Sequence, residues 1–131
     1  MNIEEIKHPE LKNHINMIYM HEENQNQTAI DKTESEIKEY IKDKEFIISI
    51  EDSKPVKIPY ANDGQYLVPI FTDKTEYLIG MDYFSLNDMA ENKEYAIEKL
   101  DCFKKLKEDP NFLGYIVNIA RVSYVISTTL L

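Results

Sequence analysis

Apolar residues recur along this chain with two periods, and each period predicts a type of element. After His8-Pro9, apolar residues follow the spacing of one helix face: Leu11, Ile15, Ile18 and Tyr19. Proline is tolerated in the first turn of a helix because its missing N–H would have no partner there. We therefore expect a first helix that begins at Pro9 and ends in the polar loop of residues 23–27.

A capping-box pattern predicts where the second helix begins. In Thr33-Glu34-Ser35-Glu36 the threonine hydroxyl can accept from an orphan N–H, and Glu36 can reach back to the cap. Ile37, Tyr40 and Ile41 then supply one apolar face. The pattern predicts a helix that begins near Thr33 and ends near Asp43.

Two segments rich in β-branched and aromatic residues predict strands, Glu45–Ile50 and Gln65–Phe71. Between them, Val56–Pro59 alternates as a short edge segment does, and Asn62-Asp63-Gly64 is a turn sequence. Pro69 cannot donate a hydrogen bond to a β-ladder. We therefore expect an edge or a bulge on one side of the second strand at that position.

The C-terminal half of the chain predicts two more helices and two more strands. Asp73–Glu76 caps a helix that turns Tyr77, Leu78 and Met81 inward, and a short strand or turn follows at Tyr83–Leu86. The most regular helical pattern is Glu94–Asp109, ended by Pro110; its apolar positions are Ala96, Leu100, Phe103 and Leu106. The remaining predicted elements are the strands Tyr115–Ile119 and Val122–Ile126, with a tight turn near Ala120-Arg121. The apolar end at Leu130-Leu131 should pack on the core or on a neighbour.

Helices and strands are mixed along one chain of 131 residues, which predicts a single globular domain of the α+β class. We expect a small mixed or mainly antiparallel β-sheet packed against helices. Within it, residues 1–32 form a helical N-terminal extension and residues 33–131 form the α+β domain.

Charge narrows the classes of partner. The net charge is −9, from 15 basic and 24 acidic residues, and Arg121 is the only arginine. A protein that neutralises phosphates needs clustered Lys and Arg, so we expect neither nucleic acid nor an anionic membrane as a partner. A basic protein partner is compatible with the charge. The N-terminus lacks an apolar signal core, and no apolar run reaches the ~20 residues of a membrane helix, so we expect a cytoplasmic protein.

The residue types that usually carry catalysis or bind metal have no supporting pattern here. His14 and His21 lie ~10.5 Å apart along the first helix, too far to share one metal ion. Cys102 is the only cysteine, so no intramolecular disulfide can form, and no histidine lies near it in sequence. Glu34, Glu36 and Glu39 form a solvated stripe. We expect no metal site, no cofactor and no enzymatic activity.

The segment from Ile58 to Glu76, with the sequence IPYANDGQYLVPIFTDKTE, resembles the signature of SseB N-terminal domains. In that family a glycine turn leads into a strand ending in Pro-x-Phe-Thr, and an acidic helix start follows. Phe112–Ile119 resembles the family's Gly-apolar-apolar-apolar-Asn-Pro strand, although Ile119 stands where proline is usual. The resemblance covers residues 33–127. It implies a small α+β fold in a bacterial cytoplasmic protein and brings no catalytic residue set.

Tyrosines gather around this signature, and aromatic rings with a polar tip are enriched at protein interfaces. We predict a binding face there, made of Tyr60, Tyr66, Phe71, Thr72, Asp73, Tyr77 and Tyr83. Core packing and helix capping are the structural alternatives for the same residues.

Four hypotheses about function stay open at this point. The leading one is a non-catalytic protein-interaction module, as a homodimer or an adaptor. An immunity-type protein that neutralises a basic toxin is a specific version of it. The third is a small-ligand sensor or minor enzyme that uses the groove near Phe71–Asp73. The fourth is a structural dimer, formed through an exposed edge near Pro69 or through Val122–Ile126.

Overall fold

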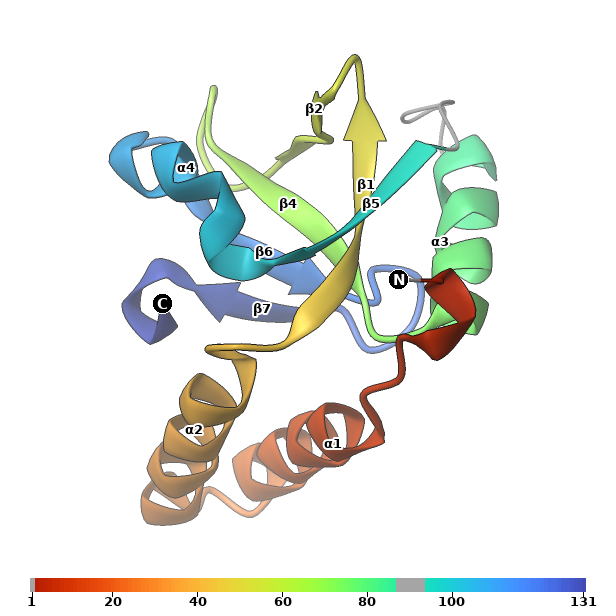
Figure 1. Cartoon of the computed structure of the whole chain (residues 1–131). Coiled ribbons are helices and arrows are strands. Elements are labelled where there is room, and N and C mark those ends of the chain that lie inside the picture. The colour runs from red at the N-terminus through yellow and green to blue at the C-terminus, as the bar shows by residue number, and fades with distance from the viewer. Residues whose placement is uncertain (1, 87–93) are drawn as a thin grey trace.

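A mixed β-sheet lies between helices on its two sides (Figure 1). The computed structural model describes residues 2–86 and 94–131, with the side chains of all of these except 85–86 and 102–105. In the described residues the sheet has seven strands, in the order β2-β1-β4-β6-β7, with β3 paired to β4 and β5 paired to β1. The predicted α+β class, with a small mixed sheet packed against helices, is confirmed.

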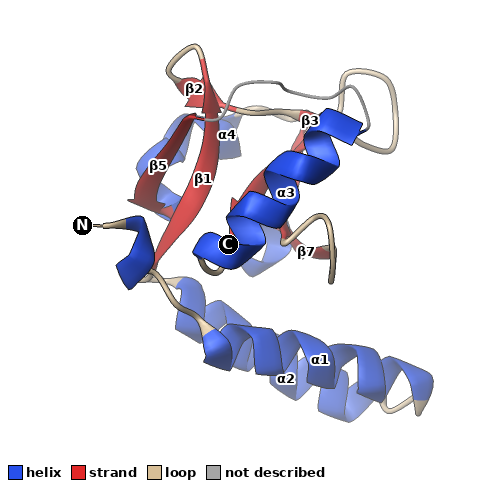
Figure 2. Ribbon diagram, turned by 90° about the vertical axis from the view of Figure 1, so that its right-hand side faces the viewer, coloured by secondary structure: helices blue, strands red, loops and turns tan. Residues whose placement is uncertain are grey.

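Two antiparallel helices near the start of the chain, α1 (Pro9–Glu23) and α2 (Gln27–Ile41), pack side by side against one side of the sheet (Figure 2). The start of α1 at Pro9 is as predicted. The predicted start of α2 at Thr33 is wrong, because Asn26 caps the helix by accepting from the Ala29 N–H. Thr33 instead lies buried inside α2, where its hydroxyl donates to the carbonyl of Ala29. The helix therefore extends across the position where the 1–32 extension and the 33–131 domain were divided.

The centre of the sheet is formed by β1 (Glu45–Glu51) and β4 (Tyr66–Phe71), both predicted as strands. Alternate residues of each strand face opposite sides, as a β-strand requires. One side of the sheet packs in a core with α1 and α2 that includes Phe46, Ile48, Val68 and Ile70. The other side packs in a second core that includes Ile47, Leu67 and Phe71.

Two short strands, β2 (Lys54–Pro55) and β3 (Ile58–Pro59), pair with β1 and β4. On this side of β4, β3 pairs with Tyr66 and Leu67 and β1 pairs with Ile70 and Phe71. Pro69 lies between these two pairings and has no pairing residue on this side of β4. Its lack of an N–H therefore breaks no hydrogen bond of the sheet. The expected break in pairing beside Pro69 is confirmed, although β4 is a central strand.

Helix α3 (Lys74–Leu86) follows β4 and covers the second core. Asp73 caps it as predicted, since its carboxylate accepts from the Glu76 N–H at 3.0 Å. The predicted short strand or turn at Tyr83–Leu86 is wrong, because these residues continue α3. The helix persists since Tyr77, Met81 and Phe84 recur on one face, and all three are buried.

The predicted helix Glu94–Asp109 is the largest error. Its first part is the strand β5 (Glu94–Lys99), and only the short helices η2 (Leu100–Phe103) and α4 (Lys104–Glu108) follow. Six consecutive residues of β5 pair antiparallel with β1. Ala96 packs on the first core and Ile97 on the second, which is the alternation of a strand. The prediction was wrong because the apolar residues of this segment also fit the spacing of a helix.

The sheet is completed by β6 (Phe112–Val117) and β7 (Tyr124–Ser127), joined by a turn that includes Ala120-Arg121. Both strands were predicted, with bounds displaced by about two residues. β6 is parallel to β4, and β7 is antiparallel to β6. The chain begins with η1 (Ile3–Glu5) and ends with η3 (Thr128–Leu130). Leu130 and Leu131 pack on the first core of their own chain.

None of the described helices is long and apolar enough to cross a membrane.

Candidate functional site

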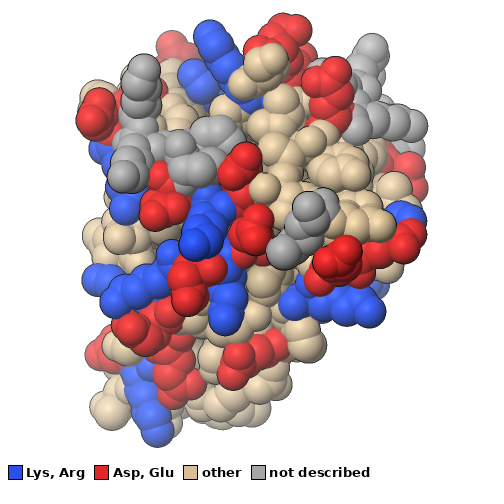
Figure 3. All heavy atoms as spheres, viewed as in Figure 1, with Lys and Arg blue, Asp and Glu red and all other residues tan. Residues whose placement is uncertain are grey.

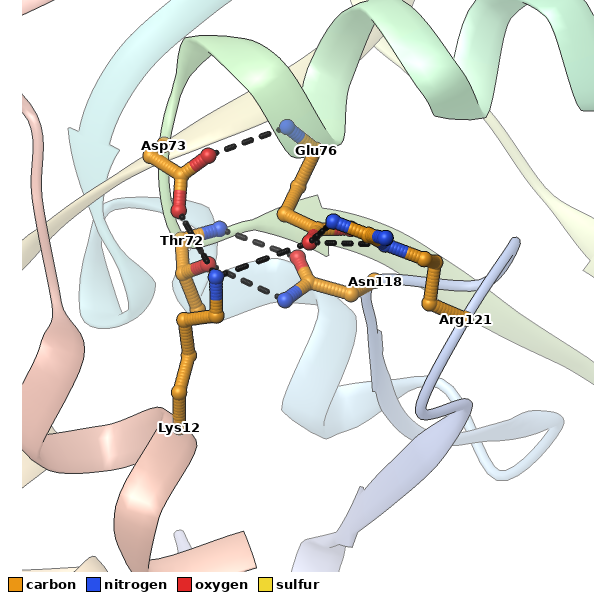
Figure 4. A network of polar contacts seen from close by, with 6 residues as sticks. All are labelled: Lys12, Thr72, Asp73, Glu76, Asn118 and Arg121. Carbon is orange, nitrogen blue, oxygen red and sulfur yellow. Dashed lines mark hydrogen bonds and ion pairs between the residues drawn. The ribbon is translucent and has the colours of Figure 1, made fainter. Parts of the chain in front are cut away.

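Polar side chains gather where the parallel strands β4 and β6 end and α3 begins (Figure 4). In open sheets the carboxyl ends of parallel strands are a common place for ligands. The group consists of Lys12, Thr72, Asp73, Glu76, Asn118 and Arg121. We call these six residues the strand-end network. They come from α1, the end of β4, the first turn of α3 and the β6–β7 turn.

Thr72 and Asn118 join the ends of the two strands. The Asn118 side-chain oxygen accepts from the Thr72 backbone N–H at 3.1 Å, and its amide nitrogen donates to the Thr72 hydroxyl at 3.0 Å. Both residues are buried. Asn118 has a φ of 50°, in the left-handed region that asparagine tolerates better than most residues. Its side chain thus takes the place of a backbone partner just after β6 ends.

Asp73 is held ionised at the start of α3. One of its oxygens accepts from the Glu76 N–H; the other accepts from the Thr72 hydroxyl at 3.0 Å and from the Lys12 ammonium at 3.4 Å. Partial burial opposes ionisation, but these hydrogen bonds and the Lys12 charge outweigh it and hold the pKa of Asp73 below its ordinary value. The site therefore presents a carboxylate at neutral pH.

Glu76 is a buried carboxylate, 3% exposed, with two cationic partners. Arg121 donates to it through two nitrogens, with Nη2 at 2.9 Å and Nε at 3.1 Å from Oε1. Lys12 Nζ lies 3.5 Å from the same oxygen. A buried charge without a partner would be strongly destabilising, so this pairing explains how Glu76 can be buried in the first turn of α3. Every side chain of the strand-end network has a polar partner, which makes it a structural joint between strands and helices.

A hollow of about 610 Å³ lies beside this joint. Its lining comes from the N-terminal segment and from the start of α3: Glu4, Ile6, Lys7, His8, Pro9, Lys12, Asp73, Lys74 and Thr75. Lys74 is paired with Glu4 at 3.0 Å across it, and Lys12 is paired with Asp73. The hollow therefore has cations and carboxylates in close alternation.

His8 borders the hollow and is itself buried. Its Nε2 lies 2.6 Å from the Glu45 carbonyl oxygen, which can only accept, so Nε2 carries the proton. Its Nδ1 then accepts from the Tyr40 hydroxyl at 2.7 Å. Burial lowers the pKa of His8, because the charged form loses its hydration. The side chain links the start of α1 to α2 and to β1.

The seven residues of the predicted binding face do not share one surface. Tyr60 is 45% exposed in the loop before β4. Phe71 and Tyr77 lie together in the second core, with ring centroids 5.5 Å apart, and Tyr83 packs against that core. Tyr66 lies in the first core, where burial and the Asp109 carboxylate raise its pKa to about 12. Thr72 and Asp73 belong to the strand-end network.

Four members of the strand-end network were missed from the sequence: Lys12, Glu76, Asn118 and Arg121. Only two of them carried a local signal, Glu76 in the first turn of a helix and Asn118 just after a strand. The contacts between Lys12 or Arg121 and Glu76 join residues far apart in the chain, so no spacing rule finds them.

The other candidate residues have these positions. His14 is half-buried, with its Nε2 3.2 Å from Glu36. His21 is half-buried near the end of α1. The side chain of Cys102 lies outside the described residues. Within the described part of the chain, no group of three or more His, Cys, Asp or Glu side chains could hold a metal ion.

Comparisons of the chain with protein-family models, with curated proteins and with solved structures found no match.

Proposed function

We propose that this protein is a non-catalytic interaction module that binds a protein partner by adding a strand at the free edge of β5. The observation that carries the proposal is the pairing of β5. It pairs with β1 over its whole length, and no other described strand pairs with it (Figure 2). An edge strand of this kind is a template for another chain.

The direction of the free backbone groups follows from the ladder. Val56 N–H donates to the Ser49 carbonyl on the β2 side of β1, so the backbone N–H and C=O groups of Ser49 point away from β5. Here the direction of a residue means the direction of these two backbone groups. Ile48, one residue earlier, is therefore directed toward β5 and exchanges hydrogen bonds with Ala96. Residues on either side of Ala96 are directed away from β1. The outward-directed residues of β5 are Tyr95, Ile97 and Lys99.

The other end of the sheet is a poorer template. Strand β7 has four residues, and its pairing with β6 directs only Val125 and Ser127 outward. The Ser127 hydroxyl is already within 2.7 Å of Thr129. By contrast, β5 contains neither proline nor a bulge, and Tyr95 on it is 43% exposed. Strand addition is thus best supported at β5.

Surface charge supports a protein partner over a nucleic acid. The net charge is −9, and on the face shown in Figure 3 the Lys and Arg side chains are interspersed with Asp and Glu. Nucleic-acid surfaces call for a continuous basic patch. A basic protein suits the charge, and an immunity-type protein that neutralises a basic toxin is one such case.

A proline at position 95 tests the proposal. The Tyr95 N–H is directed outward, so Tyr95→Pro removes a donor needed by an added strand and spares the β1 ladder. Tyr95→Thr is the matched control, because it removes the same ring and keeps the N–H. Differently tagged copies expressed together in the native cell report both self-association and other partners. We expect Tyr95→Pro to lower partner recovery at least tenfold relative to Tyr95→Thr.

Two outcomes would count against the proposal. Equal recovery with both variants would place the interface away from β5. A wild-type chain that recovers neither its own copy nor another protein would overturn the interaction module as a whole.

The hollow beside Asp73 supports a second candidate, a sensor for a small ligand. Its lysines and the first turn of α3 could bind a small anionic group, while Asp73 and Glu4 oppose one. Titration of inorganic phosphate against the wild type and Lys12→Met, followed by NMR shifts of residues 7–12 and 73–75, tests it. Shifts that are absent from both proteins would exclude this candidate.

The resemblance to SseB N-terminal domains is kept as part of the proposal. In its support, the segment Ile58–Glu76 folds as a turn at Gly64, a buried strand and a capped helix start. The proposed setting is the bacterial cytoplasm.

A further inference from the structure

We propose that the edge of β5 binds the same edge of a second copy of this chain, antiparallel, with Ile97 of one copy opposite Ile97 of the other. The inference rests on the proposed function, because it names the occupant of the same edge. A two-fold axis relates the copies, so the pair of Tyr95 and Lys99 occurs twice, and the pair of Ile97 residues occurs once, on the axis. The register of the two strands then defines the whole interface.

Hydrogen bonding limits the possible registers. Only the outward-directed residues Tyr95, Ile97 and Lys99 can exchange N–H···O bonds with an added strand. When Ile97 lies opposite Ile97 of the second copy, Tyr95 lies opposite Lys99. All three outward-directed residues then have partners within the six residues of β5. Any other register leaves at least one of them opposite a residue outside the strand.

Charge selects the same register. The next register in one direction, in which one strand has moved by two residues relative to the other, places Glu98 opposite Glu98 of the second copy. The opposite shift places Glu94 opposite Glu98, and like charges directly opposite destabilise a strand pair. With Ile97 on the axis, Glu98 lies opposite Ala96, and no carboxylate directly faces another.

The side chains also suit one another in this register. Tyr95, Ile97 and Lys99 lie on one face of β5, the face of the second core, because they alternate with Glu94, Ala96 and Glu98. Lys99 of one copy lies opposite Tyr95 of the other. The Tyr95 ring packs against Tyr77 of its own chain, with centroids 5.3 Å apart, but the residue is 43% exposed, so an ammonium can approach the ring. Ile97 is half-buried in the single chain and gains an apolar neighbour.

One strand from each copy makes a small interface, so the dimer should be weak and dependent on concentration. Two chains of charge −9 also repel one another. Added salt screens that repulsion, so we expect the dimer to strengthen with ionic strength. Binding of a basic partner at the same edge would instead weaken as the ionic strength rises.

Cysteine cross-linking tests the register directly, in a Cys102→Ser background that leaves a single introduced thiol. In the proposed register the two Cα atoms at position 97 lie ~5.5 Å apart, within reach of a disulfide. The matched control is Tyr95→Cys, whose two positions lie ~13 Å apart along the strands. We expect Ile97→Cys to form a covalent dimer at least tenfold faster than Tyr95→Cys.

Sedimentation equilibrium of the wild type provides the readout without a variant. The mass should rise from 15.4 kDa toward twice that value with protein concentration, and more steeply in 0.5 M than in about 0.05 M salt. Faster cross-linking of Tyr95→Cys would overturn the register. A mass of 15.4 kDa at every concentration, with no cross-link, would overturn the second copy as occupant. The proposed function would still stand if a different protein were lost from Tyr95→Pro and retained by Tyr95→Thr.

Discussion

At the scale of single residues, the Asn118 side chain supplies hydrogen bonds that a neighbouring strand would otherwise supply to Thr72. Its amide satisfies both the backbone N–H and the hydroxyl of Thr72 just beyond the point where β4 and β6 end. An unpaired buried N–H is destabilising, and a positive φ is unfavourable for most residues. Asparagine meets both needs at once. The position is therefore explained by structure, and we assign no catalytic role to it.

Substitution of Asn118 separates these two contributions. Asn118→Gly keeps the freedom to adopt a φ of 50° but removes the amide, and we expect it to lower the free energy of unfolding by about 1–3 kcal/mol. Asn118→Ala should lose more, because alanine also disfavours that φ. Urea unfolding followed by circular dichroism measures both. Equal stability of Asn118→Gly and the wild type would mean that the two hydrogen bonds contribute nothing net.

At the scale of elements, the contact between β4 and α3 depends on a helix position without a side chain. A Cβ atom at Gly80 would overlap the ring of Phe71, which is fully buried beneath α3. Glycine inside a helix is unfavourable relative to alanine, so its presence there indicates a packing requirement. Phe71, predicted for a binding face, thus fills the space that Gly80 leaves.

Gly80→Ala should therefore destabilise the protein, against the usual effect of this substitution. Helix propensity alone would add roughly 1 kcal/mol of stability. Overpacking against Phe71 costs about 1–3 kcal/mol, so we expect a net loss in urea unfolding. Asp82→Ala, at an exposed position of the same helix, is the control and should change little. A more stable Gly80→Ala would show that Phe71 can move aside.

At the scale of the whole molecule, His8 connects three parts of the fold. It lies before α1, and its two ring nitrogens bond to Tyr40 of α2 and to Glu45 of β1. The ring also lies 4.3 Å, centroid to centroid, from Phe46 in the first core. Because the site favours the neutral imidazole, protonation of His8 should act on the stability of the entire chain.

The sign of this pH dependence follows from the lowered pKa of His8. Above the unfolded value of ~6.5, both states are neutral and the full contribution is present. As the pH falls below ~6.5, the unfolded chain binds a proton first, and stability is lost until the folded pKa is passed. We expect the unfolding free energy of the wild type to fall more steeply from pH 7.5 to 5.5 than that of His8→Gln. The difference between the two slopes reports on His8 alone, because the two proteins differ only at that residue. Parallel slopes would exclude His8.

The sequence by itself determined the α+β fold class and most of the helices and strands. Local rules sufficed for the start of α1 at Pro9, for β1 and β4, and for the Asp73 cap, because each of these depends on residues that are close together in the sequence. They failed for Glu94–Lys99, whose apolar residues fit a helix until β1 offers an edge to pair with. Only the tertiary structure decided that pairing, the Glu76–Arg121 contact and the burial of Tyr66 and Tyr77. These features depend on segments far apart in sequence. The edge of β5, which pairs with no further strand among the described residues, exists only once the sheet has formed.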